Sequence, residues 1–188
     1  MDNHNLVQEV IDFWFGPPDS AELGSRRQVW FRATREFDLE IMQRFSKANQ
    51  LASLGALDDL KRTQMGTLTL IILLDQFSRN IFRGAPQAFA NDSKARCLAE
   101  HALEKQFDQH ILTVQKLFFY LPFEHAEDLE LQERSVKLFV ILGDAPSLQH
   151  ALCHRDQIVR FGRFPDRNKA LGRRSTKAER EFLKNPFC

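Results

Sequence analysis

The sequence predicts an all-α protein, an array of antiparallel helical hairpins with about eight helices. Three observations predict it. Apolar residues recur at intervals of three and four along most of the 188 residues. Helix start and stop signals (Asp, Thr, Gly and Pro) separate these stretches by short connections. Only the run 68–74 is apolar enough for a buried strand, and its apolar pattern continues at helical spacing.

Three helices are expected in the first half of the chain. The first spans 6–15 and is ended by the Gly16-Pro17-Pro18 turn. The second is marked by an apolar stripe from Trp30 to Ala48 with charged residues between its members. The third, 66–82, is apolar on nearly all sides at first and then polar, which predicts one buried helix.

Five more helices are expected toward the C-terminus. Asp92 is predicted to cap the first of them, and Pro122 to follow the end of the second. Thr176 and Glu179 have the spacing of a capping box at the start of the last. The expected spans are 92–107, 113–121, 128–142, 144–161 and a final helix from 177.

Length and composition limit the class of protein. A chain of 188 residues buries enough surface to fold as a single domain, 1–188, without a metal or disulfide. Most of its seventeen Phe are expected in a core. The near balance of 26 basic and 25 acidic residues argues against a dedicated nucleic-acid or membrane-surface protein, so neither is expected as a partner.

The expected location is the cytoplasm. The N-terminus lacks the pattern of a signal peptide, and no apolar run approaches the length of a membrane span. The three cysteines, Cys97, Cys153 and Cys188, are far apart and include no CxxC pair, which favours reduced thiols.

The first polar constellation follows the apolar run, between 73 and 84. Asp75 and Arg79 share a helix face, with Arg83 on the same line, and Gln76 and Asn80 share an adjacent face. A charge at the end of a buried helix must be paired or neutralised. The residues therefore form either a structural ion pair or a ligand contact.

The second constellation, 121–133, holds five acids and one imidazole. Acids near a helix N-terminus favour its dipole, which is enough to explain most of them without a function. His125 lies at an expected bend beside these carboxylates, where an imidazole suits proton transfer. A structural role for His125 is the alternative.

The third constellation, 150–168, holds three possible chemistries. His150 and His154 have a spacing that can bind a metal, but no third ligand is evident, so no metal and no other cofactor is expected. Cys153 lies next to His154, yet adjacent helical residues point in different directions, which argues against a thiol nucleophile.

A basic segment, 160–174, completes this constellation with six cations and one acid. Arginine forks bind carboxylates and phosphates. The segment either binds an anionic ligand or docks onto the protein's own acids; RNA binding through Arg and Phe is a third option. The acids considered for internal docking are Asp75, Glu124, Glu127 and Asp128.

Five stretches together resemble the domain-of-unknown-function family 924. They are FWFG (13–16), VWF (29–31), LIILLDQFSRNIFRG (70–84), LPFEHAEDLELQ (121–132) and RFGRFPDRNKALGRRST (160–176), in the same order along nearly the whole chain. The resemblance implies a bacterial-type family with an all-α, tetratricopeptide-like fold. It implies no reaction, because the family has none assigned.

The family resemblance also implies that the three polar constellations belong to one site. The chain departs from the family patterns at three positions, where Ser78, Ala126 and Asp166 replace Pro, Ser and His. The matching polar positions are Asp75, Gln76, Arg79, Asn80, Arg83, His125, Glu127, Arg160, Arg163, Arg167, Asn168 and Arg173.

Two functional hypotheses follow. The first is a polar, Arg-rich pocket that binds a small anionic ligand, with His125 as the candidate acid or base. The second is a peptide- or protein-binding scaffold in which the polar clusters form an internal network. Whether the protein is an enzyme is open. The residues expected to bind the ligand in the first hypothesis are Asp75, Gln76, Arg79, Asn80, Glu127, Arg160, Arg163, Arg167, Asn168 and Arg173.

Overall fold

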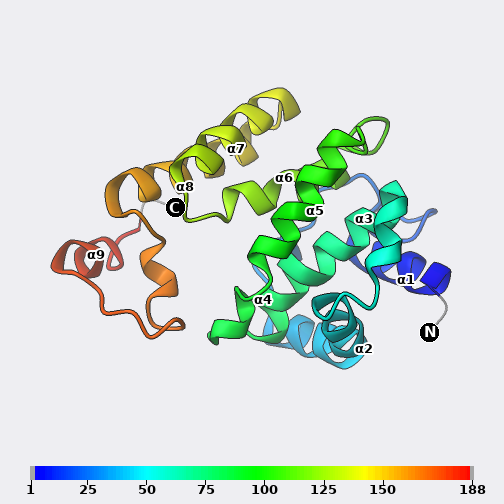
Figure 1. Ribbon diagram of the computed structural model, residues 1–188, viewed down its shortest axis with the longest axis horizontal. Coiled ribbons are helices and arrows are strands. Elements are labelled where there is room, and N and C mark those ends of the chain that lie inside the picture. Colours follow the sequence, from blue (N-terminus) through cyan, green and yellow to red (C-terminus); the bar gives the residue numbers. More distant parts are fainter. Residues whose placement is uncertain (1–2, 187–188) are drawn as a thin grey trace. The chain divides into compact units, whose positions relative to one another are not determined.

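The computed structural model describes residues 3–186, and every regular element in that range is a helix (Figure 1). The all-α prediction is therefore confirmed. The described chain divides into two compact units. Unit 1 comprises residues 3–83 and 87–119, and unit 2 comprises residues 84–86 and 120–186. None of the described helices is long and apolar enough to cross a membrane.

Unit 1 packs its helices around an aromatic core. Trp14 and Phe15 of the first helix are fully buried, and both contact the ring of Phe118 edge-on. The ring of Phe77 packs at a tilt against that of Phe45, with 4.8 Å between ring centroids. The expectation that Phe fills the core holds here. The helices of this unit are α1 (Asn3–Phe15), α2 (Arg35–Ser53), α3 (Gln64–Ile71), α4 (Ser78–Ile81), α5 (Asp92–Glu104) and the first part of α6 (Thr113–Glu124).

The second helix begins later than the apolar stripe predicted. Trp30 belongs to a short 3-10 turn, Gln28–Trp30, and its indole N–H donates to the carbonyl of Trp14 at 2.9 Å. Helix α2 starts only after Thr34, whose hydroxyl accepts from the N–H of Phe37. The stripe therefore combines two elements that bury apolar residues in the same core.

The segment predicted as one buried helix over 66–82 is interrupted by a π-helix, Ile72–Phe77, between α3 and α4. The wider π turn carries the buried Asp75 and Gln76. The side-chain amide of Asn49 on α2 donates to the carbonyl of Leu73 within this turn at 2.7 Å. Single π turns inside α-helices often mark functional sites.

Helix α5 starts at Asp92 as expected, but its cap differs. The N-cap is Asn91, and no side chain caps the helix there. The carboxylate of Asp92 instead receives both terminal nitrogens of Arg79. The helix ends at Glu104 rather than at Phe107.

Unit 2 contains the end of α6 and a helical hairpin (Figure 1). Helices α7 (Leu129–Leu142) and α8 (Ala145–Phe161) pack against each other and are joined by Gly143 and Asp144. The side chains of Asp128 and Asp144 cap their N-termini. A 3-10 turn, Pro165–Arg167, leads to α9 (Lys177–Phe182), which has the predicted capping box.

Two expectations in this part of the chain are wrong. Pro122 lies inside α6, which continues to Glu124, and the N–H of His125 still bonds to the carbonyl of Leu121 at 3.0 Å. A proline in the last turn removes one hydrogen bond without ending the helix. Cys97 is an exposed free thiol, but Cys153 is disulfide-bonded, against the expectation of reduced thiols.

Candidate functional site

The predicted site residues fall into both units. Unit 1 holds Asp75, Gln76, Arg79 and Asn80, and unit 2 holds His125, Glu127, Arg160, Arg163, Arg167, Asn168 and Arg173. Some members of each set contact one another, whereas Asn80, Arg163 and Arg160 contact other residues. The idea that all of them form one site stays a prediction.

In unit 1, Arg79 is held by two carboxylates. Its Nη1 lies 3.0 Å from Asp75 Oδ1, and its two terminal nitrogens bond to both oxygens of Asp92 at 2.9 and 3.1 Å. Gln76 donates its side-chain amide to Asp75 Oδ2 at 2.5 Å. Asp75 is 1% exposed, so a buried carboxylate is neutralised within the unit as a structural pair requires.

Asn80 and Arg83 converge on Asp38 of α2, a residue that the sequence patterns did not single out. Arg83 binds both carboxylate oxygens at 2.6 and 2.8 Å, and Asn80 donates to one of them at 2.8 Å. Burial raises the pKa of Asp38, but the bonds from Arg83 and Asn80 outweigh it and leave this pKa below its ordinary value. The contact ties α4 to α2.

In unit 2, Glu127 and Arg173 form a two-pronged ion pair at 2.6 and 2.8 Å. Arg173 also donates to Asn168 Oδ1 and to the carbonyl of Phe164. The backbone N–H of Phe164 donates to Glu127 Oε1 at 2.8 Å. Burial raises the pKa of Glu127, but the bonds from Arg173 and Phe164 and the nearby charge of Arg167 outweigh it. The pKa of Glu127 therefore lies below its ordinary value.

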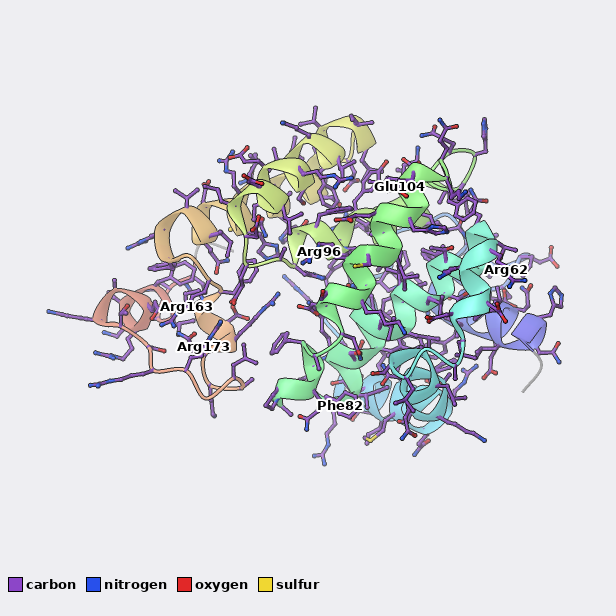
Figure 2. The ribbon with its side chains drawn as sticks, viewed as in Figure 1. Arg62, Phe82, Arg96, Glu104, Arg163 and Arg173 are labelled. Atoms are coloured by element: carbon purple, nitrogen blue, oxygen red, sulfur yellow. The ribbon has the colours of Figure 1, made fainter. Side chains whose placement is uncertain are left out.

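Arg163 pairs with Glu179 rather than with any of the four acids considered from the sequence. The guanidinium binds both carboxylate oxygens at 2.6 and 2.9 Å, and its Nη2 reaches the carbonyl of Arg174. This bond from Arg163, with those from Thr176, lowers the pKa of Glu179 to about 2 despite its burial. Figure 2 labels Arg163 and Arg173 on the segment after α8.

Arg167 and His125 also meet in unit 2. Arg167 is 8% exposed and donates to the backbone carbonyl of His125 at 3.0 Å, while its guanidinium lies 4.5 Å from the centre of the Phe164 ring. The contact involves the backbone of His125, so an acid or base role for its imidazole stays a prediction.

The basic segment is therefore divided. Arg163 and Arg173 pair with carboxylates inside unit 2, and Arg167 donates to a backbone carbonyl there. The Arg173–Glu127 pair involves one of the acids considered for internal docking, whereas Arg163 pairs with Glu179. Three exposed cations have no acidic partner among the described residues: Arg160, Lys169 and Arg174. Arg160 lies over the ring of its neighbour Phe161 at 4.9 Å. Anion binding by this segment is not tested by these contacts and stays a prediction.

The imidazole of His154 contacts a carboxylate in unit 2. Its Nδ1 lies 2.6 Å from Oε1 of Glu124, whose side chain is 4% exposed. The approach is close but poorly aligned for an N–H···O bond, and Glu124 Oε2 has no hydrogen-bond partner in the described chain. The His154 ring also packs edge-on against Phe164. No group of three His, Cys, Asp or Glu in residues 3–186 is arranged to hold a metal ion.

Unit 1 has a pocket that the sequence patterns did not indicate. Its volume is about 580 Å³, within the usual range for ligand sites. Phe82, labelled in Figure 2 at the end of α4, lines one side of it. The lining contains no charged residue. It consists of Met42, Ser46, Asn49, Gln50, Ser53, Leu54, Ile81, Phe82, Gln87, Ala90 and Asn91.

A hydrogen-bonded row of uncharged side chains adjoins this pocket. Asn49 is 3% exposed and donates to Leu73 O and, at 2.9 Å, to the hydroxyl of Ser78. Asn91 donates weakly to the same hydroxyl at 3.4 Å and accepts from Ser53 at 2.9 Å. The sequence signal was a stripe of uncharged polar residues on α2, Ser46, Asn49 and Ser53, which alone looks like an ordinary solvated face.

Comparisons with known proteins place the chain in a family. The family model described as a bacterial protein of unknown function, DUF924, matches residues 10–187. A solved structure of a protein of unknown function, ATU0120 from Agrobacterium tumefaciens, is 38% identical and superposes with a TM-score of 0.86. The match covers 97% of this chain and 99% of that one. None of the curated proteins matches the chain. The chain thus belongs to the DUF924 family of bacterial proteins of unknown function.

Proposed function

We propose that the protein is a binding protein whose ligand site is the unit 1 pocket, and that its arginine–carboxylate clusters are structural. The ligand is uncharged and largely apolar. The observation that carries the proposal is a pocket of about 580 Å³ whose eleven lining residues include no charged side chain. The tetratricopeptide-like arrangement and the cytoplasmic location expected from the sequence belong to the same proposal.

The pairing of the arginines supports this choice over the anion pocket. Arg79, Arg163 and Arg173 each bind a carboxylate through two nitrogens. An incoming anion competes with these carboxylates for the same donors. In the pocket, an anion finds no cation to replace its lost hydration, whereas an apolar ligand gains from burial.

The test is a titration followed by ¹³C-methyl NMR of Met and Ile. Methyl hexanoate and hexanoate have the same acyl chain but differ in charge at neutral pH. We expect methyl hexanoate to shift the methyl signals of Met42 and Ile81 in a saturable way, and to leave Met65 of α3 unchanged. Hexanoate is expected to bind at least about tenfold more weakly, since no cation lines the pocket.

Two variants on α2 make a matched pair for this titration. Met42 lines the pocket and Leu39 does not, although their exposed fractions are 40% and 41%. Met42→Ala is expected to weaken binding of methyl hexanoate, observed at Ile81, and Leu39→Ala to leave it unchanged. Equal effects of the two variants, or preferred binding of hexanoate, would contradict the proposal.

A further inference from the structure

The side-chain amide of Asn49 has a fixed orientation at the pocket. Its Nδ2 donates to the Leu73 carbonyl at 2.7 Å and to the Ser78 hydroxyl at 2.9 Å. Rotating the amide by 180° places Oδ1 against a carbonyl oxygen, which is repulsive. The carbonyl in question lies in the π-helix, and Leu73 itself is fully buried.

The oxygen of this amide, Oδ1, can still accept a hydrogen bond. Asn49 Oδ1 accepts no hydrogen bond from any residue in the described chain, although the residue is 97% buried and lines the pocket. A ligand that covers this oxygen without donating to it leaves it without a hydrogen bond, which weakens binding. A donor on the ligand avoids that loss, so the pocket selects for one.

Asn91 offers the complementary group. Its Oδ1 is occupied by the Ser53 hydroxyl, and its Nδ2 makes only the long bond of 3.4 Å to Ser78. A second hydrogen on Nδ2 therefore has no acceptor among the described residues. The pocket thus presents an acceptor, Asn49, and a donor, Asn91, next to the apolar side chains of Met42, Ile81 and Phe82.

We propose that the pocket recognises an uncharged amide, whose N–H donates to Asn49 Oδ1, attached to an aliphatic or aromatic group. An amide carries both a donor and an acceptor without charge, which matches Asn49 and Asn91 together. Esters and ethers lack the donor, and ammonium groups bring a charge that no lining residue balances. This inference deepens the proposed function and rests on it.

The test compares ligands rather than variants, because Asn49 also supports the fold. Hexanamide has the N–H, while N,N-dimethylhexanamide and methyl hexanoate lack it. Affinities come from saturation of the Met42 and Ile81 methyl shifts in the whole protein. Hexanamide is expected to bind about tenfold more tightly than the other two, the effect of one satisfied acceptor.

The outcomes separate the two proposals. Equal binding of the three probes at Met42 would overturn the amide inference and leave the pocket as a site for apolar ligands. No saturable shift from any probe would overturn both. A fourth probe, N-acetyl-leucine methylamide, identifies the source of the amide. Tighter binding than hexanamide assigns a peptide unit, and weaker binding assigns a free carboxamide. Either assignment requires that hexanamide binds more tightly than the two probes without the N–H.

Discussion

The guanidinium of Arg173 lies across both carboxylate oxygens of Glu127, at 2.6 and 2.8 Å, although the two residues are 46 positions apart in the chain. The pair joins the segment after α8 to the start of α7 through a half-buried contact. It also holds Phe164, whose N–H bonds to Glu127 and whose carbonyl bonds to Arg173.

Removal of this pair is expected to destabilise unit 2. Arg173→Ala leaves Glu127 half-buried without its main partner and costs about 1–3 kcal/mol. For a chain of this size, each kcal/mol lowers Tm by about 2–4 °C. Arg174→Ala is the matched control, because the Arg174 side chain is exposed and has no acidic partner in the described part of the chain. Equal Tm values for the two variants would show that the pair is not structural.

The Arg163–Glu179 pair predicts a pH dependence. The pKa of Glu179 is about 2 in the folded protein and 4.5 ordinarily. Because the folded pKa is the lower one, its contribution to stability is complete above pH 4.5 and is lost as the pH falls toward 2. Urea unfolding of wild type and Glu179→Gln between pH 6 and 2.5 should give curves that converge at low pH. For Glu181→Gln, at an exposed position of α9, the free energy of unfolding should change with pH in parallel with that of wild type. Convergence of these two curves at low pH would contradict the assignment of the pH dependence to Glu179.

Asn49 is expected to stabilise the π-helix. Asn49→Ala removes the donor to the buried Leu73 carbonyl, at a cost of about 1–3 kcal/mol. Gln50→Ala, at the next position of α2, is exposed and should change the free energy of unfolding by less than about 0.5 kcal/mol. The measurement is urea unfolding by circular dichroism. A small effect of Asn49→Ala would mean that the carbonyl does not depend on this amide.

His154 is expected to stabilise the buried carboxylate of Glu124. His154→Asn removes the imidazole and should cost about 1–3 kcal/mol, less than a fully buried pair because the His154 side chain is 28% exposed. His150→Asn, one turn earlier on α8 and exposed, is the control. Equal unfolding midpoints in urea for these two variants would rule out a stabilising contact with Glu124.

Local patterns predicted the helices because the cause of each helix is local. The capping box at Thr176 appears as expected, since it depends on residues a few positions apart. The errors have tertiary causes. Trp30 was joined to the wrong helix because two elements bury apolar residues in one core. Asp92 is not a cap because Arg79 takes its carboxylate.

The candidate site was less predictable for the same reason. Sequence spacing identified Arg163 and Arg173 as important, but their partners lie 16 and 46 positions away. The pocket depends on Asn49, Ile81 and Asn91, which come from three separate elements. No local pattern joins such residues, and a pocket without charges gives no distinctive composition.

We infer that the ligand site is the uncharged pocket and not the basic segment. The most direct measurement follows the Met42 methyl and the Arg173 Nε–H signals in one sample while hexanamide and then inorganic phosphate are added. We predict that hexanamide shifts the Met42 signal in a saturable way and leaves the Arg173 signal unchanged, and that phosphate perturbs neither signal. A saturable shift of Arg173 by phosphate, with Met42 unaffected by hexanamide, would contradict it.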